Sequence, residues 1–335
     1  MASFARAHPA IASLAWPLAA LALLVLFNLV FTPGFFSIEL RDGRFFGTPI
    51  DILNHASKVA IVAVGMTIVI ATGGVDLSVG AVVAIAGAVA AMLVTRTQAS
   101  FPLVVLAALG AGGAAGVCNG LLVSRLRLQP IVATLVLMVA GRGVAQLIPD
   151  GPITPFEHRA LSSLANVAFA FLPVPAWIAG ALALATALYA RRTAAGMFVE
   201  AVGDNDRACR YAGVNDRAIK LAAYAFCGAC AGLAGLVECS YIKAADANNA
   251  GLFLELDAIL AVVIGGTSLS GGRFSLAGSL AGAVLIQTLT KTMYMHDVSA
   301  DVAPLPKAIA VLAVCLLQSP VVKGRLSAAF SRGRA

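Results

Sequence analysis

Long apolar runs separated by short polar segments dominate the chain. A helix of about 20 apolar residues is long enough to cross a bilayer, and it satisfies its own backbone hydrogen bonds there. The pattern therefore predicts an all-α, polytopic membrane protein with about ten transmembrane helices. The apolar runs lie near 11–31, 59–72, 79–94, 101–123, 130–148, 172–190, 219–242, 254–270, 275–290 and 303–319.

Composition leaves little room for anything besides these runs. Hydrophobic residues make up 60% of the 335 residues and charged residues only 12%, whereas a soluble domain carries about 25% charged residues. Phe31-Thr32-Pro33 offers no cleavage site of small residues, so we expect the first run to be kept as a span. We predict a tail over 1–10, a transmembrane domain over 11–319 and a basic tail over 320–335.

The position of the basic residues predicts the orientation of the chain. The net charge is +7. With ten spans and the N-terminus inside, most Arg and Lys residues fall in the inside segments, while the outside segments are balanced. Cytoplasmic segments of membrane proteins carry such an excess. We therefore expect both termini in the cytoplasm, and a lipid bilayer rather than a nucleic acid as the partner of this charge.

The longest inside segment, 191–220, reads as two short helical pieces broken near Gly203 and Gly213. Asp204 or Asn205 could cap the second piece. One interpretation is a solvated basic loop. The other is a docking surface, because exposed apolar side chains often mark interaction sites. The apolar residues of the segment are Met197, Phe198, Val199, Tyr211 and Val214.

Two glycine-rich octets interrupt the apolar pattern. Five of their eight positions match: the first runs Gly73-Gly74-Val75-Asp76-Leu77-Ser78-Val79-Gly80, the second Gly265-Gly266-Thr267-Ser268-Leu269-Ser270-Gly271-Gly272. Discontinuous helices often line transport sites. We predict two glycine-broken helix regions in a parallel repeat, although a chance match in a chain rich in Gly, Ala and Ser is the alternative. The predicted hinges are Gly73, Gly74, Gly80, Gly265, Gly266 and Gly272.

Polar residues within the apolar runs are candidates for a substrate path, because they are costly in lipid. Asp76 is the strongest candidate, since its whole octet is unusual. Arg142 and Gln146 lie one helical turn apart and share a face. For each residue the alternative is a hydrogen bond between helices or a helix cap. The candidates are Asp76, Ser78, Asn119, Arg142, Gln146 and Ser268.

Several common catalytic motifs are missing from the sequence. The chain has no Gly-Lys dipeptide and therefore no P-loop. The pair Cys227 and Cys230 lies inside an apolar run, and the four His residues fall in tails or loops. We therefore expect neither catalysis nor a metal site. Glycines at helix-packing spacing, such as Gly112 and Gly116, predict closely packed helices instead.

Three segments together resemble a known family. Gly65–Gly80, the octet 265–272 and the loop Ala201–Val214 are similar to membrane permease subunits of carbohydrate-uptake ABC transporters of the ribose type. The resemblance covers about 45–318. Stretches at 41–56, 132–148 and 245–266 resemble the galactofuranose-transporting branch. The resemblance implies a permease for a monosaccharide, galactofuranose or a related furanose or pentose.

The resemblance also implies partners in a bacterial inner membrane. These are a cytoplasmic ABC ATPase with two fused nucleotide-binding halves, a periplasmic sugar-binding protein and a second permease copy, identical or closely related. No cofactor is expected in this chain, since ATP and Mg would bind the ATPase. The 191–220 segment would be the coupling segment, although Asp206 and Arg207 depart from the less charged residues of many relatives. The positions carried over are Glu200, Ala201, Gly203, Asn205, Ala208, Arg210 and Gly213.

A different reading of the same residues is an ion-gradient-driven secondary transporter of a small polar solute. It predicts uptake without an ATPase, with Asp76 or Glu238 as the ion site. The sparse charge within the runs and the docking surface at 191–220 favour the ATP-driven importer.

Overall fold

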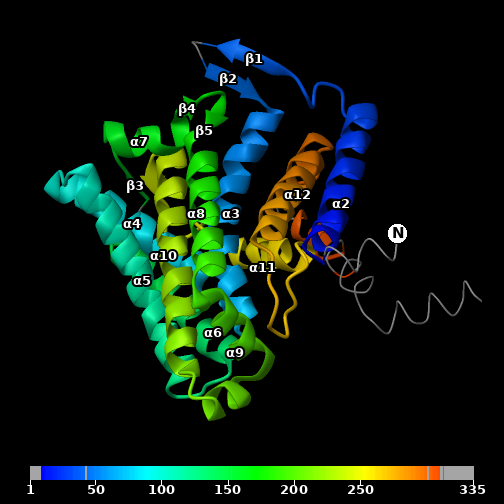
Figure 1. Ribbon diagram of the computed structural model, residues 1–335. Helices are drawn as coiled ribbons and strands as arrows, with labels where there is room; N and C mark the ends of the chain where they lie inside the picture. Colours follow the sequence, from blue (N-terminus) through cyan, green and yellow to red (C-terminus); the bar gives the residue numbers. More distant parts are fainter. Residues whose placement is uncertain (1–8, 42–43, 152, 300–301, 310–311, 313–335) are drawn as a thin grey trace, which may run out of the picture.

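The computed structural model describes residues 9–41, 44–151, 153–299, 302–309 and 312. This part of the chain is mostly helical (Figure 1). The predicted tail 320–335 lies outside the described residues, as does most of the predicted tail 1–10. The helices are α2 (Pro9–Phe31), α3 (Thr48–Ala71), α4 (Val79–Thr97), α5 (Phe101–Ser124), α6 (Pro130–Leu147), α7 (Arg159–Asn166), α8 (Val174–Arg192), α9 (Ala194–Tyr211), α10 (Asp216–Ile242), α11 (Leu254–Ile264) and α12 (Leu276–Met295).

Three short antiparallel strand pairs add to the helices and were not predicted from the apolar pattern. Strand β1 (Ile38–Arg41) pairs with β2 (Arg44–Gly47), β3 (Thr154–Pro155) with β6 (Ala244–Ala245), and β4 (Ala168–Phe169) with β5 (Leu172–Pro173). In Figure 1 the β1–β2 hairpin lies at one end of the helix bundle and α9 at the other. We call these the hairpin end and the α9 end.

Seven helices within the described residues are long and apolar enough to cross a membrane: α2, α3, α4, α5, α6, α8 and α10. Helix α11 has only 11 residues, which at 1.5 Å per residue is about half of a bilayer's hydrocarbon core. The last apolar run, 303–319, falls mostly outside the described residues. A polytopic helical protein is therefore observed, while the number of about ten spans stays a prediction.

Helix α3 begins well before the apolar run that predicted it. Its first turns contain Asp51, His55 and Lys58, which the sequence pattern assigned to a loop; that assignment is wrong. Helix α3 starts where Pro occupies its first turn, as α5, α6 and α8 also do. Proline is suited to this position because the first N–H groups of a helix lack partners within the helix.

The predicted close packing of small residues is confirmed. Helices α5 and α10 meet so closely that a Cβ atom on Gly112 would lie 2.3 Å from the Gly228 carbonyl oxygen, and one on Gly116 would lie 2.2 Å from the Tyr224 carbonyl oxygen. A Cβ atom on Gly282 of α12 would similarly lie 2.1 Å from the Ala261 oxygen of α11. These contacts bring the backbone of α5 against α10 and that of α12 against α11.

Candidate functional site

Helix α9, which forms most of the 191–220 segment, consists of two pieces. They meet at Asn205, whose φ of −157° and ψ of 96° are not helical. The Asn205 Oδ1 atom accepts a hydrogen bond from the Ala208 N–H at 3.0 Å, so Asn205 caps the second piece. The prediction of two pieces with a cap at 204 or 205 is confirmed. The second piece ends before Gly213, which has a φ of +82°.

Gly203 joins the first piece of α9 to the last residue of α3 and to the second glycine octet. A Cβ atom on Gly203 would lie 1.8 Å from the Ala71 carbonyl oxygen and 2.5 Å from the Gly272 nitrogen. The Gly272 N–H itself donates a hydrogen bond to the Ala71 oxygen at 3.0 Å. We call this contact the Gly203 junction. It brings together two groups of residues that the sequence suggested separately, the coupling candidates and the glycines.

Charged side chains hold the second piece of α9 to α10. The Arg210 guanidinium donates two hydrogen bonds of 3.1 Å to the carboxylate of Asp216, which is buried. The Lys220 ammonium lies 2.9 Å from an Asp206 oxygen, and this hydrogen bond lowers the pKa of Asp206. Arg210 therefore pairs within this chain.

The remaining coupling candidates differ in exposure. Glu200 and Ala201 are half-buried, while Asn205, Ala208 and Gly213 are exposed.

Three path candidates form a buried polar cluster near the α9 end. The Asp76 Oδ1 atom accepts hydrogen bonds from the Ser78 N–H at 2.9 Å, the Ser78 hydroxyl at 2.7 Å and the Asn119 amide at 3.2 Å. All three side chains are buried. The sequence analysis missed Tyr224 of α10, whose hydroxyl donates to the Val75 carbonyl oxygen at 3.2 Å. A Cβ atom on Gly74 would lie 2.5 Å from the same hydroxyl oxygen.

Arg142 and Gln146 share a face of α6, as predicted, but they lie at a second place. The Arg142 guanidinium donates to the carbonyl oxygens of Ala247 and Ala250 at 3.1 and 2.6 Å. The Gln146 amide donates to Asn248 at 2.8 Å. Both residues thus bind the segment that leads into α11.

Gly80 and Ser268 lie at two further places. A Cβ atom on Gly80 would lie 2.4 Å from the Gly251 carbonyl oxygen, so the start of α4 meets the segment before α11. Ser268 is exposed, and its hydroxyl lies 2.7 Å from that of Ser270. The six path candidates therefore do not form one site.

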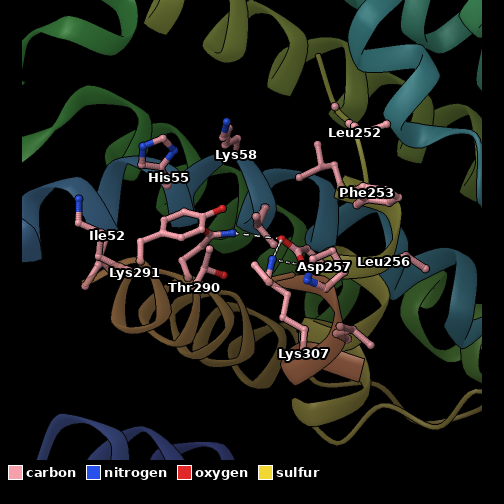
Figure 2. A pocket seen from close by; sticks show the side chains of 18 of the residues that line it. Ile52, His55, Lys58, Leu252, Phe253, Leu256, Asp257, Thr290, Lys291 and Lys307 are labelled. Carbon is pink, nitrogen blue, oxygen red and sulfur yellow. Dashed lines mark hydrogen bonds and ion pairs between the residues drawn. The ribbon is translucent and has the colours of Figure 1, made fainter. Parts of the chain in front are cut away.

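A cavity of about 640 Å³ lies between α3, α10, α11 and α12, toward the hairpin end. Figure 2 shows charged side chains from several elements around it, with Lys307 beside Asp257. This cavity was not predicted from the sequence. The signal was present in the spacing of Asp51, His55 and Lys58, which places all three on one face of α3.

Three ion pairs line the cavity, and each joins different parts of the chain. Lys58 of α3 pairs with Glu238 of α10. Lys291 of α12 pairs with Asp51 of α3 at 3.0 Å. Lys307 pairs with Asp257 of α11 at 2.9 Å, and Gln287 donates to the same carboxylate at 3.3 Å. The three carboxylates and three ammonium groups balance, so the cavity combines many hydrogen-bonding groups with no net charge from these pairs.

Among the described residues, no group of three or more His, Cys, Asp or Glu side chains is placed to hold a metal ion. Asp51, Glu238 and Asp257, the acidic residues of the cavity, are instead each paired with a lysine ammonium group.

A family model described as the permease component of the branched-chain amino acid transport system matches residues 48–317. The chain belongs to this family. It is therefore a membrane permease subunit and not an enzyme. The match begins at the first residue of α3 and so includes the cavity, the polar cluster and the Gly203 junction.

Several curated proteins are similar to most of the chain. The galactofuranose transporter permease protein YtfT of Escherichia coli (strain K12) is 52% identical, over 91% of this chain and 90% of the relative. The fructose import permease protein FruF of Bifidobacterium longum is 40% identical, over 96% and 92%. The ribose import permease protein RbsC of Escherichia coli (strain K12) is 38% identical, over 89% and 92%. No solved structure matches the chain.

Proposed function

We propose that this chain is the membrane permease of an ATP-driven sugar importer in a bacterial inner membrane. The observation that carries the proposal is the Gly203 junction. Helix α9 lies at the end of the bundle and is packed at Gly203, without space for a single Cβ atom, against the end of α3 and the segment that follows α11. A force applied to α9 by another protein would therefore move both, which is what an ATPase needs from its permease.

The transported solute is a monosaccharide, with galactofuranose the first candidate. The names of three relatives give galactofuranose, fructose and ribose as their sugars, and all three sugars are uncharged. A cavity of about 640 Å³ falls within the usual range for small-molecule sites, about 300–1,000 Å³. Its balanced ion pairs suit an uncharged ligand with many hydroxyl groups, because ammonium groups donate and carboxylates accept hydrogen bonds.

The orientation follows from the basic residues. The α9 end would face the cytoplasm together with both termini, and the hairpin end would face a periplasmic sugar-binding protein. Sugar would enter at the cavity and pass inward near the polar cluster of Asp76, Ser78 and Asn119. Arg142 and Gln146 would hold the segment before α11 beside this route, and Ser268 would lie at the cytoplasmic exit.

The same proposal includes the finer features of the transporter. About ten spans, two of them broken at the glycine octets, would make up the domain over 11–319. A cytoplasmic ATPase with two fused halves would bind ATP and Mg, and a second permease copy would complete the pore. Closure of the ATPase halves would draw the α9 helices together, shift the segments at the Gly203 junction and open the path outward.

Reconstitution tests the proposal directly. The chain is placed in liposomes with its ATPase and binding protein, and uptake of radiolabelled galactofuranose is measured with and without ATP. We expect uptake only with ATP, with ribose and fructose as weaker competitors. Uptake by the chain alone that collapses when an ionophore removes the ion gradient would instead support the secondary transporter.

A variant pair tests the cavity separately from the energy source. Lys291→Met leaves the Asp51 carboxylate without its ammonium partner inside the cavity, and we expect it to lower uptake. Lys243→Met is the matched control, because Lys243 does not line the cavity. Equal uptake by both variants would exclude the cavity from the sugar path.

A further inference from the structure

A second hollow, of about 580 Å³, lies at the α9 end of the bundle. Its walls come mainly from α8, α9 and α10, and nearly all of them are apolar. Helices α8 and α10 are both long and apolar enough to cross a membrane, so this groove opens at the level of the bilayer. The larger side chains that line it are Tyr189, Phe198, Ile219, Phe226 and Phe274.

Two features place the groove at the boundary between lipid and water. Tyr189 lines it and is 64% exposed, and tyrosine is enriched at this boundary in membrane proteins. Two exposed arginines also lie within two residues, along the chain, of residues that line the groove. Arg192 lies in the last turn of α8, one turn beyond Tyr189, and Arg273 directly precedes Phe274.

We propose that this groove binds an anionic phospholipid. One acyl chain would fill the apolar groove, and the phosphate would lie at Arg192 and Arg273. The surrounding bilayer supplies acyl chains at high concentration, so an apolar groove at this depth is filled from there. The arginines add selectivity, because basic residues near a membrane surface attract anionic headgroups by about 1 kcal/mol each.

The lipid would also stabilise the coupling segment. Phe198 and Val199, on the first piece of α9, form one wall of the groove, and the same piece carries Gly203. A bound acyl chain would thus hold this piece against α8 and α10. Only this consequence rests on the proposed function; lipid binding itself does not depend on which solute is carried.

The lipids retained by the purified protein test the proposal without any transport assay. The full chain is purified in detergent and incubated with equal amounts of dioleoyl phosphatidylglycerol and dioleoyl phosphatidylcholine. Native mass spectrometry then counts the retained lipids. We expect phosphatidylglycerol to be retained in preference. Arg192→Gln should reduce this preference about fivefold, which corresponds to about 1 kcal/mol. Arg125→Gln should not, because Arg125 is an exposed arginine with no groove-lining residue near it along the chain.

A groove-filling variant provides the second arm. Ala222→Trp places a large ring in the groove from an exposed position of α10 and should abolish retention of both lipids. Ala181→Trp, on an exposed position of α8 outside the groove, should retain them. Equal retention of the two lipids by the natural chain would overturn the proposal. So would loss of a dimer rather than of lipid in Ala222→Trp, since a second copy would then occupy the groove. If Ala222→Trp does not fold, the Arg192→Gln comparison decides alone.

Discussion

The segments that follow α3 and α11 begin alike and then diverge. After α3, the Gly73 and Gly74 N–H groups donate to the carbonyl oxygens of Ile70 and Val69; after α11, those of Gly266 and Thr267 donate to Val263 and Val262. Both helices thus end in the same hydrogen-bond pattern, with a glycine at positive φ, +79° for Gly73 and +90° for Gly266.

Beyond this shared helix end, the two segments have different surroundings. The first turns into the bundle and buries Asp76 and Ser78, which bond to each other. The second buries Thr267 but exposes Ser268 and Ser270. The repeat therefore reproduces the end of a helix and not a polar site. The second segment meets the end of α3 at the Gly203 junction, through the hydrogen bond from Gly272 to Ala71.

The largest effect is expected at the Gly203 junction. Gly203→Val would push side-chain atoms into the Ala71 oxygen and the Gly272 nitrogen. Because both contacts are backbone atoms, α9 must move away. Coupling free energies between sites are typically about 1–3 kcal/mol, so we expect ATP-driven uptake to fall about 5- to 150-fold. Uptake and ATP hydrolysis are measured in the reconstituted transporter.

Gly143→Val is the matched control for this change, because a Cβ atom there has no neighbour within 4 Å. It should reach the membrane and transport normally. Gly203→Val should also reach the membrane, with ATP hydrolysis continuing while uptake falls. Normal uptake by Gly203→Val would show that the junction transmits no movement.

The sequence predicted those parts of the fold that depend on neighbours along the chain. The apolar runs located the long helices. The break of α9 at Asn205 was indicated by residues suited to cap a helix, Asp204 and Asn205. The ion pairs of the cavity could not be predicted in this way, because Lys58 and Glu238 lie far apart in sequence and pair only when α3 packs on α10. The start of α3 at Thr48 was missed for the same reason, since its polar first turns face the cavity.

The repeat illustrates the same limit. The sequence match aligned Gly73 with Gly265, whereas hydrogen bonding pairs Gly73 with Gly266, one residue later. Gly265 is instead a packing position, where a Cβ atom would lie 2.4 Å from the Gly278 carbonyl carbon. The sequence alone does not distinguish a glycine needed for its φ angle from one needed for its small size.

A second prediction separates the buried segment from the exposed one. Asp76→Ala removes the acceptor for the Ser78 N–H and one acceptor for Asn119. It should lower the free energy of unfolding by about 1–3 kcal/mol, the cost of a buried polar group left without a partner. Ser268→Ala should stay within about 0.5 kcal/mol, as for most exposed positions. Both are measured by denaturant titration in detergent. Equal losses would mean that the two segments carry comparable polar sites.

A third prediction tests which glycines are equivalent. Gly73→Ala and Gly266→Ala should each cost about 1–2 kcal/mol, because an L-residue at positive φ is strained by that amount. Gly265→Ala should cost more: its φ of −63° is not strained, but a Cβ atom there collides with the backbone of α12. Thermal unfolding of the three variants in one detergent ranks them. Equal losses of stability in Gly73→Ala and Gly265→Ala would instead support the sequence alignment, which pairs Gly73 with Gly265.

The smallest effect concerns the second piece of α9, which charge rather than close packing holds to α10. The hydrogen bond from Lys220 lowers the pKa of Asp206 below its usual 3.8. The stabilisation is therefore present at pH values above about 3.8 and is lost as pH falls through the lowered pKa. It is small because Asp206 is partly exposed and solvent screens the pair.

Thermal unfolding from pH 7 to 3 should show Asp206→Asn slightly less stable than the natural chain at pH 7, with the difference vanishing only below about pH 4. A difference that vanished already near pH 6 would mean that a group other than Asp206 controls this contact. The Gly203 junction is built from backbone atoms, so it should hold the first piece of α9 unchanged over the whole pH range.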